Sequence, residues 1–170
     1  MSGSQFPTWN AGQRITAGIL QTMTPIVAFK TAATSRASTT IMTTDPDLFI
    51  DLTVNGTYLL EGFINYTGGT LGASDLKLAV NYTGTQTNGV WGGQGITTAS
   101  ITALQSMSTV IGPTGVAWGT NAGVFQDLTL NGFFQTTTSG ELQVQWAQNT
   151  SNGTSTNLRA GCWIKLTQVA

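Results

Sequence analysis

The sequence contains no histidine, and charged residues are scarce. Asp, Glu, Lys and Arg together make up 8% of the 170 residues, against about 25% in an average soluble protein. Without histidine the chain lacks the usual general base, every Ser–His or Cys–His pair and the commonest zinc ligand. The seven acidic residues show neither the spacing of a calcium loop nor a feature that selects a glycosidase pair. These absences predict a protein that is not an enzyme and that binds no cofactor and no metal.

A basic patch is also missing. Six Lys and Arg residues against seven Asp and Glu give a net charge of -1, and the basic residues do not cluster. The chain therefore lacks the charge that displaces counterions from nucleic acid or attracts a membrane surface. No apolar run approaches the ~20 residues of a membrane helix, and the first seven residues have no signal-peptide pattern. We expect synthesis in the cytoplasm, with no nucleic-acid partner and no membrane partner.

The sequence has one cysteine, Cys162, which excludes an internal disulfide. Cys162 stands in a segment of alternating polar and apolar residues, so we predict a small buried hydrophobic residue there.

Residues 1–25 carry a different pattern from the rest of the chain. An extended entry that contains proline is followed by Thr16, a candidate helix N-cap, and by apolar residues at helical spacing that end before Pro25. This pattern predicts an anchoring arm with a brief helix, followed by one domain over residues 26–170. An apolar arm without a partner strand needs a surface on which to dock. The arm residues expected to make that contact are Phe6, Trp9, Arg14, Ile15, Ile19, Leu20 and Met23.

From residue 26 onward, apolar and polar residues alternate in segments separated by Gly, Asn, Asp and Pro. Many short strands without intervening helices predict an all-β fold, an antiparallel sandwich or barrel. Asn55-Gly56 is a tight hairpin signal, and Asp45-Pro46-Asp47 is predicted to be a turn whose side chains accept backbone hydrogen bonds. The expected strands are 26–31, 39–44, 48–54, 57–67, 76–83, 100–111, 124–136, 141–149 and 158–169. In the strand 48–54, alternation places Leu48, Ile50, Leu52 and Val54 on one face.

Two of the expected strands, 57–67 and 124–136, are apolar on both faces. A strand in a two-layer sandwich buries only one face internally, so the other face needs a partner, and a second copy of the chain supplies one. The alternative is that a glycine-rich loop over 84–99 covers one of the aromatic residues of these two strands. The residues expected to mediate self-association are Tyr58, Leu59, Phe63, Tyr66, Phe133 and Phe134.

The five tryptophans fall in two kinds of context. Trp146 and Trp163 lie within regular strand patterns and are expected in the core. Trp91 and Trp118 lie in glycine-rich segments that we interpret as loops, and they are the candidates for exposed contact with a ligand. Residues 91–95 lack the Lys-Ser/Thr pair and the helix of a phosphate-binding loop, so we predict a mobile loop between strands.

Several stretches together resemble tailed-bacteriophage virion proteins. Gly140-Glu-Leu-Gln-Val-Gln-Trp-Ala-Gln-Asn149, with the Ser/Asn/Thr loop and Leu158-Arg-Ala-Gly-Cys-Trp-Ile-Lys-Leu166 after it, resembles their last hairpin. Gly56-Thr-Tyr-Leu-Leu-Glu-Gly-Phe-Ile64 is similar to the strand that opens their conserved portion. Trp9-Asn-Ala-Gly-Gln-Arg-Ile-Thr-Ala-Gly-Ile-Leu20 is similar to N-terminal segments of structural proteins from actinobacterial viruses. The segment 84–122 matches least.

The resemblance implies an antiparallel jelly-roll β-sandwich, like that of tumour-necrosis-factor-type and complement-type trimers. It implies a homotrimer whose aromatic strands meet near a threefold axis, with the arm reaching to the particle. The expected function is that of a capsid decoration protein, bound to the major capsid protein at local threefold positions on the exterior of the phage head.

The alternative is a tail or fibre-tip receptor-binding domain that recognises a host saccharide through Trp91 and Trp118. Tail fibres often have a long shaft, whereas only residues 1–25 precede the expected domain. The sequence therefore favours the head protein.

Overall fold

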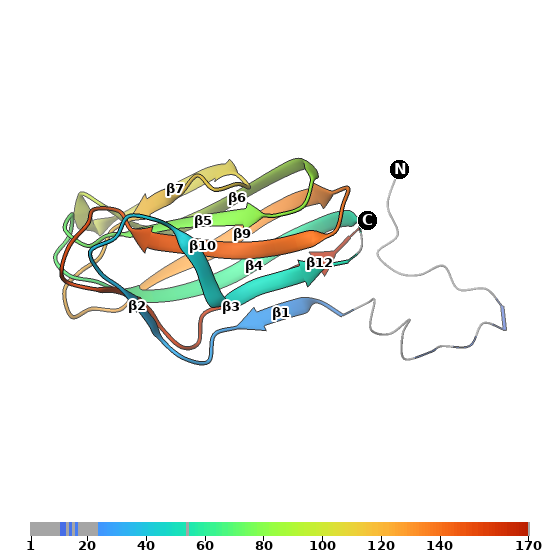
Figure 1. Cartoon of the computed structure of the whole chain (residues 1–170), viewed down its shortest axis with the longest axis horizontal. Coiled ribbons are helices and arrows are strands. Elements are labelled where there is room, and N and C mark those ends of the chain that lie inside the picture. Colours follow the sequence, from blue (N-terminus) through green and yellow to red (C-terminus); the bar gives the residue numbers. More distant parts are fainter. Residues whose placement is uncertain (1–10, 13, 15, 17–23, 54, 170) are drawn as a thin grey trace.

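The computed structural model describes residues 11, 12, 14, 16, 24–53 and 55–169 (Figure 1). The described residues form strands and loops and include no helix, and therefore no helix that could span a membrane. The strands are β1 (Ile26–Phe29), β2 (Thr34–Arg36), β3 (Thr43–Leu52), β4 (Gly56–Thr67), β5 (Leu76–Tyr82), β6 (Gln86–Thr97), β7 (Ser100–Val110), β8 (Val116–Trp118), β9 (Gln126–Thr136), β10 (Gly140–Gln148), β11 (Thr156–Leu158) and β12 (Trp163–Gln168).

The strands form two sheets that lie against one another (Figure 1). The large sheet has eight strands in the order β1-β12-β4-β9-β6-β7, with β11 paired to both β4 and β2. The small sheet has four strands in the order β3-β10-β5-β8. All of these pairs are antiparallel. The predicted all-β, antiparallel, sandwich-like architecture is therefore confirmed.

The core collects the apolar residues from one face of each long strand, as a period of two requires. Leu48, Ile50 and Leu52 of β3 are all buried, which confirms the face predicted for this segment. Leu60 and Ile64 of β4 are buried in the same core cluster. Removing these residues from water supplies the main driving force for packing one sheet on the other.

The buried position predicted for Cys162 is also confirmed. Its thiol accepts a hydrogen bond from the backbone N–H of Asn65 at 3.2 Å and donates one to the Asn65 carbonyl at 3.3 Å. Burial raises the pKa of the Cys162 thiol and keeps the sulfur protonated and unreactive.

The segment predicted as a glycine-rich loop over 84–99 is instead β6, a strand of 12 residues between β9 and β7. The prediction was wrong because glycines replace the apolar residues that mark the inner face of a strand. The ring of Trp118 occupies their place. A Cβ added at Gly95 would lie 3.1 Å from Cε3 of Trp118, and one at Gly93 would lie 3.3 Å from Cζ2.

Asp45-Pro46-Asp47, predicted as a turn, lies within β3. This strand is at an edge of the small sheet, where a proline without N–H is tolerated. The pairing of β3 with β10 shifts register between Gln143 and Gln145, which accommodates the extra residues around Pro46. The predicted hydrogen bond to the backbone is present, because the N–H of Asp47 donates to Oδ1 of Asp45 at 3.1 Å.

Candidate interaction surface

Strands β4 and β9 divide the six predicted self-association residues between the two faces of the large sheet. Tyr58, Tyr66 and Phe134 point into the core and are at most 2% exposed. The rings of Tyr58 and Phe134 stack with centroids 5.4 Å apart. For these three residues the predicted contact with a second copy is wrong, because the small sheet covers the face on which they lie.

Leu59, Phe63 and Phe133 lie on the opposite face of the large sheet, which we call the outer face. Strand pairing places Leu59 beside Phe133, Phe133 beside Val90, and Val90 beside Val110. Opposed residues of an antiparallel pair share a face, so these four form one apolar row across β4, β9, β6 and β7. Their side chains are partly or largely exposed.

A second row on the outer face is aromatic. Phe29 of β1 pairs with Trp163 of β12, and Trp163 pairs with Phe63 of β4. Trp163 is only partly buried, and therefore the prediction that it is a core residue was wrong. Phe29 is 55% exposed because β1 is the last strand of the sheet on this side.

One ion pair separates the two rows. Lys165 of β12 lies opposite Glu61 of β4, and Nζ of Lys165 is 2.6 Å from Oε2 of Glu61. Both side chains remain in contact with water. Because the two charges compensate each other, the outer face offers apolar rows around a pair with no net charge.

The segment 84–99 does not cover this face, contrary to the alternative considered from the sequence. Strand β6 extends the large sheet in its own plane by pairing with β9. Its residue Val90 adds to the apolar row instead of shielding it.

Trp91 and Trp118, predicted to be exposed, are 1% and 0% exposed. Trp91 belongs to β6 and Trp118 to β8, and both belong to the buried core cluster. The glycines near each residue suggested loops, but they make room for a buried ring. Neither indole can touch a ligand at the surface of this chain.

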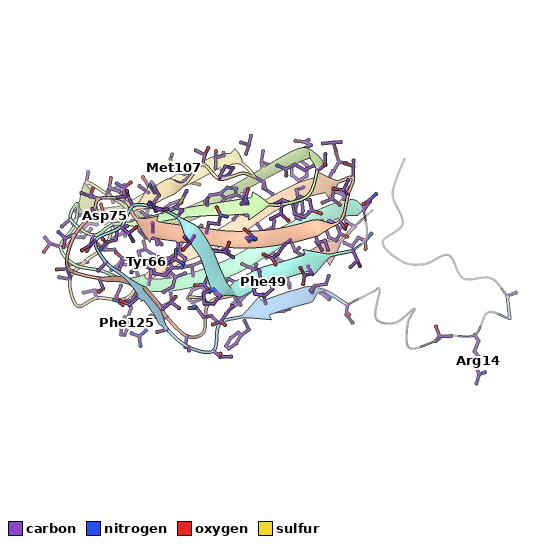
Figure 2. All side chains as sticks on the ribbon, viewed as in Figure 1. Arg14, Phe49, Tyr66, Asp75, Met107 and Phe125 are labelled. Carbon is purple, nitrogen blue, oxygen red and sulfur yellow. The ribbon has the colours of Figure 1, made fainter. Side chains whose placement is uncertain are left out.

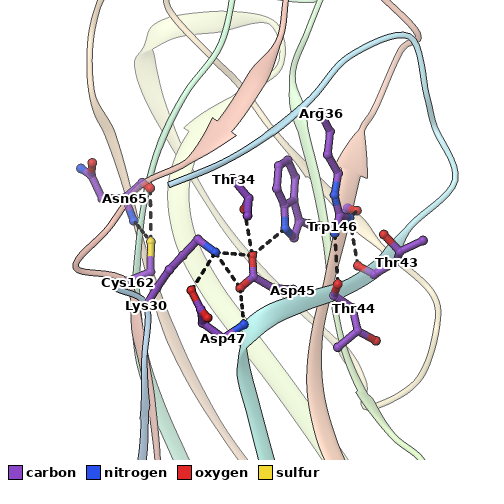
Figure 3. Close-up of polar contacts among 10 residues, drawn as sticks. All are labelled: Lys30, Thr34, Arg36, Thr43, Thr44, Asp45, Asp47, Asn65, Trp146 and Cys162. Carbon is purple, nitrogen blue, oxygen red and sulfur yellow. Dashed lines mark hydrogen bonds and ion pairs between the residues drawn. The ribbon is translucent and has the colours of Figure 1, made fainter. Parts of the chain in front are cut away.

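A buried polar cluster links β1 to the small sheet (Figure 3). Nζ of Lys30 lies 2.8 Å from Oδ1 of Asp45, and both side chains are completely buried. The Asp45 carboxylate also accepts hydrogen bonds from the Thr34 hydroxyl at 3.1 Å and from the Trp146 indole N–H at 3.0 Å. A second carboxylate oxygen, Oδ2 of Asp47, lies 3.5 Å from Nζ of Lys30.

Arg36 lies at the edge of this cluster. Its guanidinium sits over the Trp146 ring, 4.2 Å from the centroid, and donates to the carbonyl oxygens of Thr43, Thr44 and Trp146. Burial lowers the pKa of Arg36, and the charge of Asp45 opposes this effect. The ion pair of Lys30 with Asp45 and the hydrogen bonds of Arg36 hold β1, β2 and β3 in place, so the cluster has a structural role. In the sequence, the only indication of this cluster was the pair of aspartates on either side of Pro46.

Among the described tyrosines, Tyr66 has the most strongly raised pKa. Its hydroxyl donates to the carbonyl oxygen of Gly119 at 2.9 Å within the core. Burial raises the pKa of Tyr66 well above its ordinary value, and the negative charges of Asp75 and Asp127 raise it further.

This shift predicts a loss of stability in alkali. Above pH of about 10 the unfolded chain releases the Tyr66 proton while the folded chain retains it, so the free energy of unfolding falls as pH rises. We expect Tyr66→Phe to lose about 1 kcal/mol at pH 7, through its hydrogen bond, and to weaken the alkaline decline. Urea unfolding at pH 7 and pH 10.5 measures both effects. An equally steep decline in the variant would contradict the assignment to Tyr66.

Of the predicted arm residues, Phe6, Trp9, Ile15, Ile19, Leu20 and Met23 lie outside the described residues, as does most of the predicted brief helix. Arg14 is described and exposed. Among the described residues, no group of three or more His, Cys, Asp or Glu side chains is placed to hold a metal ion.

Comparison of the chain with protein-family models and with curated proteins gives no match.

Proposed function

We propose that this protein is a non-enzymatic structural protein of a tailed-bacteriophage virion, and that it associates with copies of itself through the outer face of the large sheet. The observation that carries the self-association is the pair of apolar rows on that face, whereas the virion assignment rests on the resemblance of residues 9–20, 56–64 and 140–166 to phage structural proteins. Leu59, Val90 and Val110 are each more than a third exposed, and the ion pair of Lys165 and Glu61 between the rows needs no external charge. Such a face is suited to a neutral, apolar partner surface.

The strand order supports a jelly-roll topology as the finer form of the sandwich. Four of the antiparallel pairs are nested in the sequence, and the pairing of β12 with β4 and of β10 with β5 joins them side by side in the two sheets. β1 pairs with β12, β3 with β10, β4 with β9, and β5 with β8. This is the pairing that results when one long antiparallel hairpin is wrapped into two sheets, as in viral capsid jelly rolls.

Within this proposal the protein is a homotrimer that decorates the phage head. Its three arms bind the major capsid protein at local threefold positions on the exterior of the particle. Joining three weak anchors in one trimer raises their effective concentration, so each arm needs only modest affinity. The alternative of a fibre-tip domain that recognises a saccharide loses its support, because Trp91 and Trp118 are buried.

Labelled antibodies on purified virions, viewed by electron microscopy, test the location. We expect label over the head. Label found only at the tail tip would overturn the decoration proposal. Deletion of residues 1–25 distinguishes self-association through the outer face from capsid binding through the arm. The shortened protein should still form trimers but fail to bind heads.

Sedimentation tests the outer face directly. We expect the wild type to form trimers and Leu59→Lys to weaken their association about a hundredfold or more, because each contact would bury an unpaired charge. Ile41→Lys is the matched control, since Ile41 is 75% exposed in the loop between β2 and β3. A monomeric wild type at micromolar concentration, or equal effects of both variants, would contradict self-association through this face.

A further inference from the structure

Strand β7 (Ser100–Val110) forms one end of the large sheet and pairs only with β6 among the described strands. It is 11 residues long, and most of its side chains are exposed on both faces. Figure 2 shows Met107 at this border of the molecule. Its large apolar residues are Ile101, Leu104, Met107 and Val110, with exposures from 44% to 65%.

The other strands that border the two sheets each carry a feature that hinders pairing with a further strand. β1 has four residues, and β2 and β8 have three each. β3 is longer, but it contains Pro46 and a register shift and carries three aspartates. Short length, proline, irregularity and charge are the usual protections of an edge strand.

β7 lacks the short length, the proline and the charge, and its register with β6 shifts only at its N-terminal end, between Ser100 and Leu104. Between Ser100 and Val110 it contains no charged residue and no proline. Its pairing with β6 is regular from Val90 opposite Val110 to Ile96 opposite Leu104. Gln105 fixes the strand further, because its side-chain amide donates to the carbonyl of Ala117 in β8 at 2.6 Å. From Leu104 to Val110 the backbone groups of β7 that point away from β6 are therefore held in an extended row, while the Thr102 N–H donates to the Ser100 hydroxyl.

We propose that the free edge of β7 pairs with β7 of a second copy of this chain, in antiparallel orientation about Gln105. Because β7 contains no charged residue, pairing two copies of it brings no like charges together. In this register every large apolar residue of β7 faces a small or short polar residue across the twofold axis, which favours close packing. The opposed residues are Leu104 with Ser106, Met107 with Ala103, Ile101 with Thr109, and Val110 with Ser100.

This contact goes beyond the proposed function, because it uses the edge of the large sheet and not the outer face. The edge contact is twofold, whereas the proposed trimer is threefold. In a protein that makes both contacts, β7 joins one trimer to the next. Val110 belongs to both contacts, but Leu59 belongs only to the outer-face row and Ser106 only to the edge contact, so substitutions at Leu59 and Ser106 let the two proposals fail independently.

Hydrogen–deuterium exchange of the full chain at low and high protein concentration tests the edge contact. In an edge strand about every second amide points away from its neighbour. We expect exchange of these outward amides in residues 100–110 to slow about tenfold or more at the concentration where the protein associates. The amides of β4, in the middle of the sheet, should change little.

Ser106→Lys should abolish this protection and remove the twofold step from sedimentation profiles, because it places like charges near the axis. Ser151→Lys, an exposed serine in the loop after β10, is the matched control. Circular dichroism shows whether Ser106→Lys folds. If it folds poorly, Thr102→Lys repeats the test on the same strand. Leu59→Lys should keep the protection of β7 while losing the outer-face contact.

Unchanged exchange of β7 on association would overturn the proposal. So would association of Ser106→Lys and Thr102→Lys that equals the wild type. A polydisperse series of aggregates in place of a discrete twofold species would also overturn it, since it would identify β7 as an unspecific sticky edge.

Discussion

Replacing Lys30 by methionine is expected to lower the free energy of unfolding by about 3–5 kcal/mol, because the substitution leaves the Asp45 carboxylate buried without its cation. Nζ of Lys30 lies 2.8 Å from Oδ1 of Asp45, and neither side chain reaches water. Three neutral donors, from Thr34, Asp47 and Trp146, remain on the carboxylate. They stabilise it in part, which places the expected loss toward the lower end of the range. Equilibrium denaturation in urea measures the difference.

Lys165→Met is the matched control for that variant. Lys165 forms an ion pair at 2.6 Å with Glu61, but both side chains are partly exposed. Pairs of this kind contribute about 0–1 kcal/mol, since water and salt screen them. Equal losses from Lys30→Met and Lys165→Met would contradict the importance of burial. The double variant Lys30→Met/Asp45→Asn should recover part of the loss, because the amide is uncharged and still accepts the Trp146 N–H.

Trp118→Ala is expected to destabilise the protein by about 3–5 kcal/mol, as large-to-small changes of buried aromatic residues do. The ring is completely buried, and it lies on the backbone of β6 at Gly93 and Gly95. Its removal would open a cavity that neither glycine can fill. Thermal or urea unfolding provides the measurement.

Trp163→Ala is the comparison, because Trp163 is only partly buried on the outer face and leaves no enclosed cavity. We expect a clearly smaller loss of stability from it when the protein is monomeric. A loss below about 0.5 kcal/mol for Trp118→Ala would instead be typical of a surface residue, and would restore the ligand-contact hypothesis for Trp118.

The alternation of residues in the long strands made much of the fold predictable. Leu48, Ile50 and Leu52 were assigned to one face because side chains alternate across a strand, and all three are buried. The same rule divided β4 into two apolar faces, with Leu60 on one and Leu59 on the other. The pattern did not reveal β6, because an inner face made of glycines carries no hydrophobic signal.

The candidate surface was predictable only in part. The sequence pattern indicated that Leu59 and Phe63 lie on a face of their strand distinct from that of Tyr58, and that Phe133 and Phe134 lie on opposite faces of theirs. It did not indicate which face the small sheet covers, so the core residues were assigned to self-association with the others. The partners Val90 and Trp163 came only from the strand register, because Val90 is 43 positions from Phe133 and Trp163 is 100 positions from Phe63.

The absence of histidine, the scarcity of charge and the period of two are properties of the sequence by itself. They determined an all-β chain and gave no pattern for a catalytic group, because side-chain chemistry and alternation are local. Only the tertiary structure decided that Trp91 and Trp118 are buried, that Lys30 meets Asp45, and that β7 is left at an edge. Each of these depends on which strands become neighbours, and that is fixed by packing between distant segments and not by any one of them.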